Sequence, residues 1–361
     1  MIWGREMFDN KRRVSDSIRN RRGLTLIEVL VIVGIIAVAL CLWFPAVEYS
    51  RESARRSQCQ NQLKQLGLAL HSYHDALTQF PPGTIWPRFQ YDNPRTPFLP
   101  FLLPYLDQVT LYNQINWDVS DTLWCHGNNE AVVKTPVPQL LCPSDGIGGA
   151  TKINPYCGTQ ATTNYMGFFG ERIVDAVLHV SVFTANRGTQ IDEITDGLSN
   201  TMMMGEYLTG TPKDLRGQMW GDEAGASLLF CQLRPNSPSP DLLYPNPKIW
   251  DPANPEINAP SRNLPCGAGD GFTTDTVASR SRHRGGVYVL MADGSVRFVS
   301  DAVNLATWRT LGIVLRMTSE SSILNRVTEP APSETPPTRK FPGRSTSRLE
   351  PSEASCVSID F

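Results

Sequence analysis

The sequence lacks several patterns that mark common classes of protein. None of its eight cysteines forms a Cys-x-x-Cys pair, so neither a zinc ribbon nor a thioredoxin-type redox motif is indicated. A Gly-x-Ser-x-Gly element is also missing, which removes the usual nucleophile elbow of α/β hydrolases. The net charge is only −2, so the overall charge gives no indication of a nucleic-acid partner. What remains is a chain of 361 residues, 41% hydrophobic, that is able to bury a sizeable core.

The N-terminus combines a basic leader with an apolar run. Residues 1–23 carry seven basic and three acidic side chains, a charge of about +4, which leaves about −6 for the remainder. The run from Leu24 to Phe44 has about 21 residues and would measure roughly 31 Å as a helix, enough to span a bilayer. Glu28 is its only charged residue, and a carboxylate in hydrocarbon costs a few kcal/mol at least. The basic leader predicts that the segment before the run stays in the cytoplasm.

Three interpretations of this run compete. A signal peptide cleaved after its apolar core has a shorter core followed by small residues, whereas this run ends in LWFPAVEYS. A plain signal anchor fits the length but gives Glu28 no role except to reach toward the membrane surface. The third interpretation is a prepilin-type signal, which is cleaved before the apolar run.

The segment resembles the N-terminus of type IV prepilins and pseudopilins. Arg21-Arg22-Gly23 is followed by Leu24-Thr25-Leu26-Ile27-Glu28, with Leu24 where the family more often has Phe. The resemblance implies that a prepilin peptidase cuts between Gly23 and Leu24 and N-methylates the new amine of Leu24. It also implies that Glu28 neutralises the amine of a neighbouring subunit during assembly, which turns a costly buried charge into a paired one. Pro45 is the position at which many pilins have a kink in the helix.

The periodicity of the next segment predicts that the helix continues beyond the membrane. One apolar stripe recurs at spacings of three and four, namely Leu63, Leu66, Leu70, Tyr73 and Leu77. Pro81-Pro82-Gly83 should stop the helix. We therefore expect one long bent helix, with residues 24–44 in the membrane and residues 45–80 as an amphipathic extension on a globular head, the design of pilins. The charged residues 48–58 suit the membrane surface.

Residues 83–316 predict a head rich in turns and short strands. The clearest element is a hairpin, with strands Val287–Met291 and Ser295–Val299 joined by Asp293-Gly294. Leu198–Leu208 is apolar enough for a buried strand, residues 96–115 favour short helices, and Leu305–Leu315 favours one more helix. The predicted fold is therefore α+β and pilin-like, with an antiparallel sheet on the long helix. Residues 327–361 are rich in Pro, Ser and Thr, which predicts a disordered tail.

Five segments together resemble a bacterial family that is expanded in planctomycetes and combines a prepilin-like N-terminus with a domain of unknown function. They are NQLKQLGLALHSYHD (61–75), LLPYLDQ (102–108), LCPSD (141–145), DGLSNTMMMGE (196–206) and SRHRGGVYVLMADGSVRFV (281–299). The last contains the family signature, His283 followed after nine residues by Asp293-Gly294. The resemblance covers residues 21–316 and implies an architecture more than a chemistry.

Cysteine pairing is open at this level. Six cysteines belong to the helix extension and the head: Cys59, Cys125, Cys142, Cys157, Cys231 and Cys266. If the head lies outside the cytoplasm, they can form up to three disulfides, with fifteen possible connectivities. A bond from Cys59 would fasten the helix to the head, and Cys142 is the partner we suggest. A buried free thiol at Cys59 is the alternative.

Candidate chemistry in the head is sparse. His283 and Asp293 would need a nucleophile for catalysis, so we expect them to hold a loop and a turn. Asp196, Asn200 and Glu206 offer oxygen ligands of the kind that calcium prefers, although the segment lacks EF-hand spacing, and an Asp-Gly turn before a strand is the alternative. No other metal or cofactor is expected.

The sequence therefore predicts a single-pass protein of the bacterial inner membrane with an extracytoplasmic head. We expect a structural subunit, not an enzyme, of a pilus-like or type II secretion-like assembly. Its partners would be the membrane, the prepilin peptidase and other pilin-like subunits or further copies of itself, without nucleic acid. The alternative is a membrane-anchored module that binds a solute or glycan and uses the signal only for delivery. Glu28 separates the two, because only the assembly subunit needs it.

Overall fold

The computed structural model describes most of the chain between residues 25 and 314. The described residues are 25–86, 95–118, 122–125, 127–146, 149–172, 175, 180–214, 216–244, 251–271 and 274–314, without the side chains of residues 42 and 44–46. The predicted leader 1–23, the cleavage residues Gly23 and Leu24, and the predicted tail 327–361 lie outside them.

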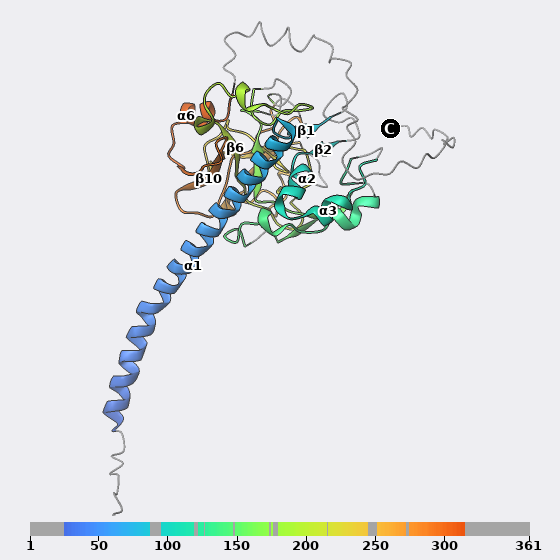
Figure 1. Ribbon diagram of the computed structural model, residues 1–361. Coiled ribbons are helices and arrows are strands. Elements are labelled where there is room, and N and C mark those ends of the chain that lie inside the picture. The colour runs from blue at the N-terminus through green and yellow to red at the C-terminus, as the bar shows by residue number, and fades with distance from the viewer. Residues whose placement is uncertain are drawn as a thin grey trace, which may run out of the picture. The chain divides into compact units, whose positions relative to one another are not determined.

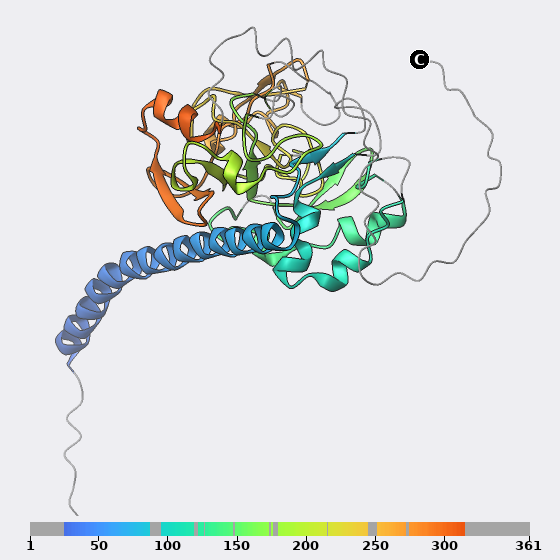
Figure 2. The ribbon, with the colours of Figure 1, turned by 45° about the horizontal axis from the view of Figure 1, so that its top comes forward.

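The N-terminal part is one long helix, α1 (Leu26–Leu77), of 52 residues (Figure 1). Thr25 caps its start, and the helix continues through Pro45 without a break. Figure 2 shows that α1 is curved rather than straight. It ends before Pro81-Pro82-Gly83, because Thr78 takes a left-handed conformation with φ 61° and donates its N–H to the carbonyl of His74.

The first half of α1 exposes its apolar side chains. Leu26 is 78% exposed and Ile27 72%, and the large apolar residues from Val29 to Leu40 are exposed as well. Among the described residues, no helix combines the length and the apolarity needed to cross a membrane. The transmembrane interpretation of residues 24–44 stays a prediction.

The second half of α1 packs on the head, and its apolar stripe was predicted correctly for four of five residues. Leu63, Leu66, Leu70 and Tyr73 are buried, whereas Leu77 is 38% exposed at the end of the helix. This half contacts the strands β10 (Gly286–Met291) and β11 (Val296–Ser300), and also short helical segments at residues 99–106 and 138–140. Burial of about four large side chains on one stripe holds the helix to the head.

The main sheet has five strands in the order β11-β10-β6-β5-β7. Its members are β5 (Tyr165–Phe168), β6 (Met202–Glu206), β7 (Leu228–Leu229), β10 (Gly286–Met291) and β11 (Val296–Ser300). Neighbours are antiparallel except β5 and β7, which are parallel. The hairpin β10–β11 and the fully buried strand β6 confirm the two strand predictions made from sequence.

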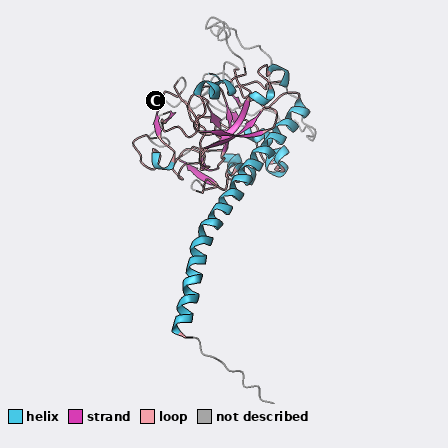
Figure 3. Cartoon of the chain, turned by 90° about the vertical axis from the view of Figure 1, so that its left-hand side faces the viewer, coloured by secondary structure: helices cyan, strands magenta, loops and turns pink. Residues whose placement is uncertain are grey.

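Smaller elements surround this sheet (Figure 3). Three two-stranded sheets pair β1 (Thr84–Ile85) with β2 (Thr96–Pro97), β3 (Thr151–Asn154) with β4 (Gly158–Ala161), and β8 (Asp241–Leu243) with β9 (Cys266–Ala268). The helices are α2 (Leu99–Leu102), α3 (Val109–Asn113), α4 (Glu130–Val133) and α6 (Leu305–Leu311), with 3-10 turns at Leu103–Leu106, Gly127–Asn129, Pro138–Leu140, Ile191–Glu193, Leu198–Asn200 and Pro260–Arg262. The fold is therefore mixed α+β with antiparallel sheets, as predicted.

A buried ion cluster organises the loops between β6 and β10. Arg216 is fully buried and donates to the carboxylates of Asp214 and Asp241, and Arg280 donates to Asp241 from the other side. Tyr207 completes the cluster by donating its hydroxyl to Asp241 at 2.8 Å. Because each buried charge is paired, this region holds together with little regular secondary structure.

Candidate functional site

The segment from His283 to Gly294 lies along α1, where strand β10 runs beside the helix. His283 precedes β10 and faces Glu52 of α1, while Asp293-Gly294 forms the turn after it, beside Gly67 and His71 of α1. A Cβ placed on Gly67 would lie 2.8 Å from Leu290 Cδ1 and 3.5 Å from Gly294 Cα. The nine residues between His283 and Asp293 therefore connect two contacts with the same helix, one at Glu52 and one at Gly67 and His71.

We call the contact between α1 and the head around Glu52, Glu206 and His283 the junction. Its most polar feature is a histidine held between two carboxylates. His283 has its Nε2 3.1 Å from Glu206 Oε1 and its Nδ1 3.4 Å from Glu52 Oε1. Its side chain is 0% exposed, and that of Glu206 is 2% exposed. The second oxygen of Glu206 accepts the N–H of Tyr288 at 2.8 Å. The cluster thus joins α1, the end of β6 and the start of β10.

These contacts shift the pKa values of His283 and Glu52. Burial acts to lower the pKa of His283, but its hydrogen bonds and charge interactions with Glu206 and Glu52 raise it overall above 6.5. Burial acts to raise the pKa of Glu52, but hydrogen bonds from Arg55, Ser144 and His283 lower it overall. The contacts therefore favour the protonated imidazole of His283 and the ionised carboxylate of Glu52.

A disulfide lies beside this histidine and joins Cys59 of α1 to Cys142, the two cysteines that sequence analysis offered as a pair. A second bond joins Cys125 to Cys157, while Cys231 and Cys266 are buried free thiols. The donor atoms of Cys59, Cys142, Glu206 and His283 all lie within 4.8 Å of one another. Four segments that are distant in sequence thus bring two sulfurs, one nitrogen and one oxygen together.

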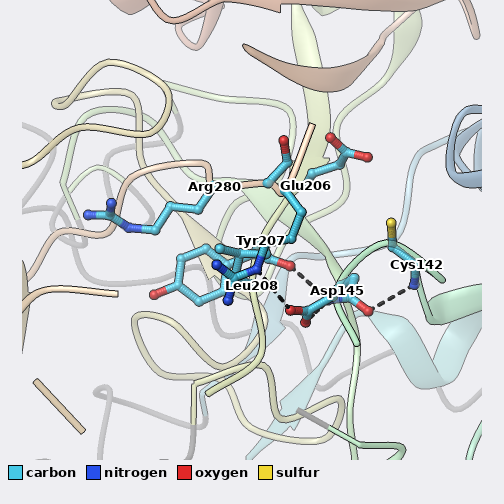
Figure 4. A pocket seen from close by; sticks show the side chains of 9 residues that line it. Cys142, Asp145, Glu206, Tyr207, Leu208 and Arg280 are labelled. Carbon is cyan, nitrogen blue, oxygen red and sulfur yellow. Dashed lines mark hydrogen bonds and ion pairs between the residues drawn. The ribbon is translucent and has the colours of Figure 1, made fainter. Parts of the chain in front are cut away.

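Asp145 anchors the loop that carries Cys142. Its Oδ2 accepts hydrogen bonds from Asn164 Nδ2 at 2.7 Å and from Thr209 Oγ1 at 2.6 Å, and Asn164 Oδ1 accepts the N–H of Cys142 at 2.8 Å. Figure 4 shows this pocket, with Cys142, Asp145, Glu206 and Arg280 among its lining residues. The cavity holds only about 10 Å³, room for one water rather than a substrate.

Two residues that line this cavity, Asp145 and Arg282, each have one buried polar atom without a hydrogen-bond partner among the described residues, namely Oδ1 and Nη2. The Nε of Arg282 lies 4.0 Å from Asp145 Oδ1. A single bound water would bridge such a pair, so the pocket is suited to structural solvent.

Arg56 of α1 adds a second contact next to the histidine. Its Nε donates to the hydroxyl of Tyr288 at 3.0 Å, and its guanidinium lies 4.1 Å from the centre of the Phe298 ring. Glu52 and Arg56 belong to the charged segment 48–58 that we assigned to the membrane surface. The side chains of these two residues contact the head, and the position of the segment at a membrane surface stays a prediction.

The calcium ligands suggested from sequence do not converge. Asp196 and Asn200 lie before β6, where Asn200 Nδ2 donates to the carbonyl of Asp196 at 3.3 Å. Glu206 lies at the other end of β6, about 17 Å away along an extended strand, and its carboxylate is paired with His283. The alternative interpretation, a turn that leads into a strand, is the arrangement in the structure.

The remaining candidates have local surroundings. Glu28 accepts hydrogen bonds from the N–H of Thr25 at 2.8 Å and from its hydroxyl at 2.9 Å, and Thr25 accepts the N–H of Glu28, which makes a capping box. Asp293 accepts the N–H of Ser295 at 2.8 Å within its turn. Two further histidines of α1, His71 and His74, both pack on the ring of Phe80.

Several contacts in the structure were not predicted from the sequence. The capping box of Thr25 and Glu28 at the start of α1 follows a known sequence pattern, but the apolar run was interpreted as a membrane segment instead. Glu52 and Arg56 carry no local signal, because their partners are more than two hundred residues away. Asp145 was visible only as a member of the LCPSD segment.

Outside the junction, a groove of about 350 Å³ lies on the C-terminal part of the head. It is lined by residues 232–239 together with Asp301 and Leu305. Its volume is at the lower end of the range for small-molecule sites.

Comparison with known proteins gives one match. No curated protein and no solved structure matches the chain. A family model matches residues 49–306, a span of 258 residues, which is about seven-tenths of the 361-residue chain. The match begins in α1 just before Glu52 and includes every member of the cluster around His283. The chain therefore belongs to the family described as protein of unknown function (DUF1559).

Proposed function

We propose that this protein is a prepilin-like structural subunit of a pilus-like or type II secretion-like envelope assembly, and not an enzyme. In this proposal a prepilin peptidase cleaves before Leu24, residues 24–44 lie in the bacterial inner membrane, and the head is extracytoplasmic. The observation that carries the proposal is the division of α1 into an exposed apolar half and a half fastened to the head.

The exposed half supports packing against other helices or lipid. Its apolar side chains from Leu26 to Leu40 are open to solvent in the isolated chain, which is unfavourable unless another apolar surface covers them. Among the described residues, the carboxylate of Glu28 contacts only Thr25. It therefore remains accessible to a positive charge on a second subunit.

The fastened half supports a structural rather than catalytic role for the junction. His283 and Glu206 are almost fully buried, the neighbouring sulfurs are bonded to each other, and the adjoining cavity holds about one water. A substrate has no access to such a group, and a nucleophile is missing among the described members of the cluster. The cluster is suited to keeping the helix and the head in one register.

The test begins with the N-terminus. The full chain is extracted from its own host with a mild detergent, and its mass is measured. We expect a start at methylated Leu24. A chain that starts at Met1 would contradict processing and would favour the alternative of a plain anchored module that binds a solute or glycan, for which the groove beside Asp301 is the available surface.

Assembly is then measured by recovery of an untagged copy, or of other pilin-like subunits, with a tagged copy. Glu28→Ala should lower this recovery about tenfold or more, because an unpaired amine at the membrane costs at least 1.4 kcal/mol. Glu48→Ala is the matched control, since Glu48 is an exposed acid of the same helix that pairs with Arg51.

Thr25→Ala separates charge pairing from helix capping. It removes the capping box and keeps the carboxylate of Glu28, so the proposal expects recovery to be retained. Equal losses in Thr25→Ala and Glu28→Ala would assign the effect to the cap, and full recovery with Glu28→Ala would contradict the proposal.

A further inference from the structure

We propose that Cys59, Cys142, Glu206 and His283 form a binding site for Zn²⁺ when the disulfide between the two cysteines is reduced. The site goes beyond the proposed function and does not depend on it. One structural position would then hold the helix to the head in two ways, through a sulfur–sulfur bond or through a metal ion.

The donor set is the first argument. Two thiolates, one imidazole nitrogen and one carboxylate oxygen are the ligands that zinc takes in tetrahedral sites. The four donor atoms lie within 4.8 Å of one another. They come from α1, the loop that carries Cys142 (called the 142 loop below), β6 and the segment before β10. Ligands that come from distant segments are held by the fold rather than by a flexible loop.

The distances are the second argument. Two ligands of one tetrahedral zinc, with bonds of about 2.0–2.2 Å, lie roughly 3.3 Å apart. His283 Nε2 and Glu206 Oε1 are already 3.1 Å apart. The two sulfurs must separate to roughly 3.8 Å after reduction, which rotation of the cysteine side chains supplies. Their Cα atoms are 5.1 Å apart.

The surroundings of the ligands are the third argument. Zinc-bound histidines usually place their second ring nitrogen against a carboxylate, which fixes the ring and its tautomer. His283 has this arrangement, because its Nδ1 lies 3.4 Å from Glu52. The second oxygen of Glu206 accepts the N–H of Tyr288, and the N–H of Cys142 donates to Asn164. The ligands are thus oriented before a metal arrives.

Reduction of the disulfide precedes metal binding. A water-soluble phosphine breaks the sulfur–sulfur bond and becomes its phosphine oxide with the oxygen of one water, whose two protons complete the thiols of Cys59 and Cys142. The metal ion then displaces both thiol protons and the proton that His283 carries on Nε2, and it binds the two thiolates and the freed imidazole nitrogen. Two thiolates and the carboxylate of Glu206 bring three negative charges to the dication, and a neutral His283 completes the site.

The experiment uses the full chain in detergent, reduced by the phosphine without oxygen and then freed of it. Co²⁺ serves as the probe, since thiolate-bound tetrahedral cobalt has intense visible and charge-transfer bands. We expect saturation at one Co²⁺ per chain and displacement by Zn²⁺.

The matched variants are Cys59→Ser and Cys125→Ser, each of which removes one disulfide. The proposal expects Cys59→Ser to lose the cobalt bands and Cys125→Ser to keep them. Glu52→Gln should weaken Co²⁺ binding by about 10–100-fold, as a residue that orients a ligand does. Bands that survive Cys59→Ser but vanish in Cys125→Ser, or a reduced chain without bands, would overturn the proposal.

If the chain unfolds on reduction, the proposal is tested by whether Zn²⁺ refolds it. Zn²⁺ should then restore its circular dichroism, because binding is coupled to folding, and Mg²⁺ should not. Failure of Zn²⁺ to restore the fold would count against the site as clearly as missing cobalt bands.

Discussion

At the scale of single residues, the charge of His283 is the feature with the clearest physical consequence. Three ionisable side chains from three parts of the chain share one small volume, and two of them are acids. The imidazole gains more from its two carboxylates than it loses by burial, so the folded chain binds this proton more tightly than the unfolded chain does.

We therefore predict a pH-dependent contribution of His283 in the disulfide-bonded chain. Since its folded pKa is raised, the stabilisation is fully present below about pH 6.5 and is lost as pH rises through the higher folded pKa. The difference in unfolding free energy between wild type and His283→Gln should therefore shrink from pH 5 to pH 8. Urea unfolding at a series of pH values measures it.

Two other acids define the limits of that experiment. The lowered pKa of Glu52 gives stability that is present above about pH 4.5 and lost below it, so the series stays above pH 5. Burial raises the pKa of Asp275 to about 6, but this group is common to both proteins and cancels. A difference that is constant or grows with pH would show that His283 acts as a neutral side chain.

At the scale of elements, the packing of β10 along α1 depends on a glycine in the helix. Gly67 leaves room for Leu290 and for the Asp293-Gly294 turn, and a larger side chain would push the hairpin from the helix. Glycine costs a helix about 1 kcal/mol relative to alanine, so its presence here reflects the close approach of the two elements.

Gly67→Leu should accordingly destabilise the head by about 2 kcal/mol or more through overpacking. Leu68→Ala is the control in the same turn of α1, because Leu68 is 70% exposed and its truncation should change stability by less than about 0.5 kcal/mol. Urea midpoints of the two variants and the wild type provide the measurement. Equal effects at residues 67 and 68 would mean that the hairpin does not press on this turn.

The elements themselves were largely predictable, and their contacts were not. The stripe Leu63–Tyr73 and the Asp-Gly hairpin were found because local periodicity and turn chemistry specify them. The junction was not found, because Glu52 with His283 and Asp145 with Asn164 are pairings that only the tertiary fold creates. The buried cluster around Arg216 was missed for the same reason, since isolated charges in loops are usually interpreted as surface residues.

At the scale of the whole molecule, the core of the head begins within α1. Cys59 is the first buried residue of the helix among those described, and the large apolar residues from Leu26 to Leu40 are exposed, as are Trp43 and Tyr49. The part of α1 before residue 47, as far as its side chains are described, therefore contributes little to the folding of the head, whereas the second half of α1 is an integral part of it.

Two truncations test this division. A chain that starts at Val47 keeps the buried stripe and the disulfide to Cys142, so its melting temperature should stay within about 4 °C of the full chain. A chain that starts at Gln79 loses both and should show no cooperative unfolding. Circular dichroism during heating measures the two, and a cooperative transition in the shorter chain would contradict the assignment of α1 to the core.

The position of the Cys59–Cys142 bond also determines how the protein responds to mechanical force. A pull along the exposed half of α1 reaches the bond before it reaches the packed stripe, because Cys59 precedes Leu63, Leu66 and Leu70. A helix held only by packing peels away turn by turn under tension, whereas here the tension passes directly into the 142 loop and from there, through Asn164, toward the sheet. The bond thus makes the head and its helix one mechanical unit, which withstands traction that would strip a helix held by side-chain contacts alone.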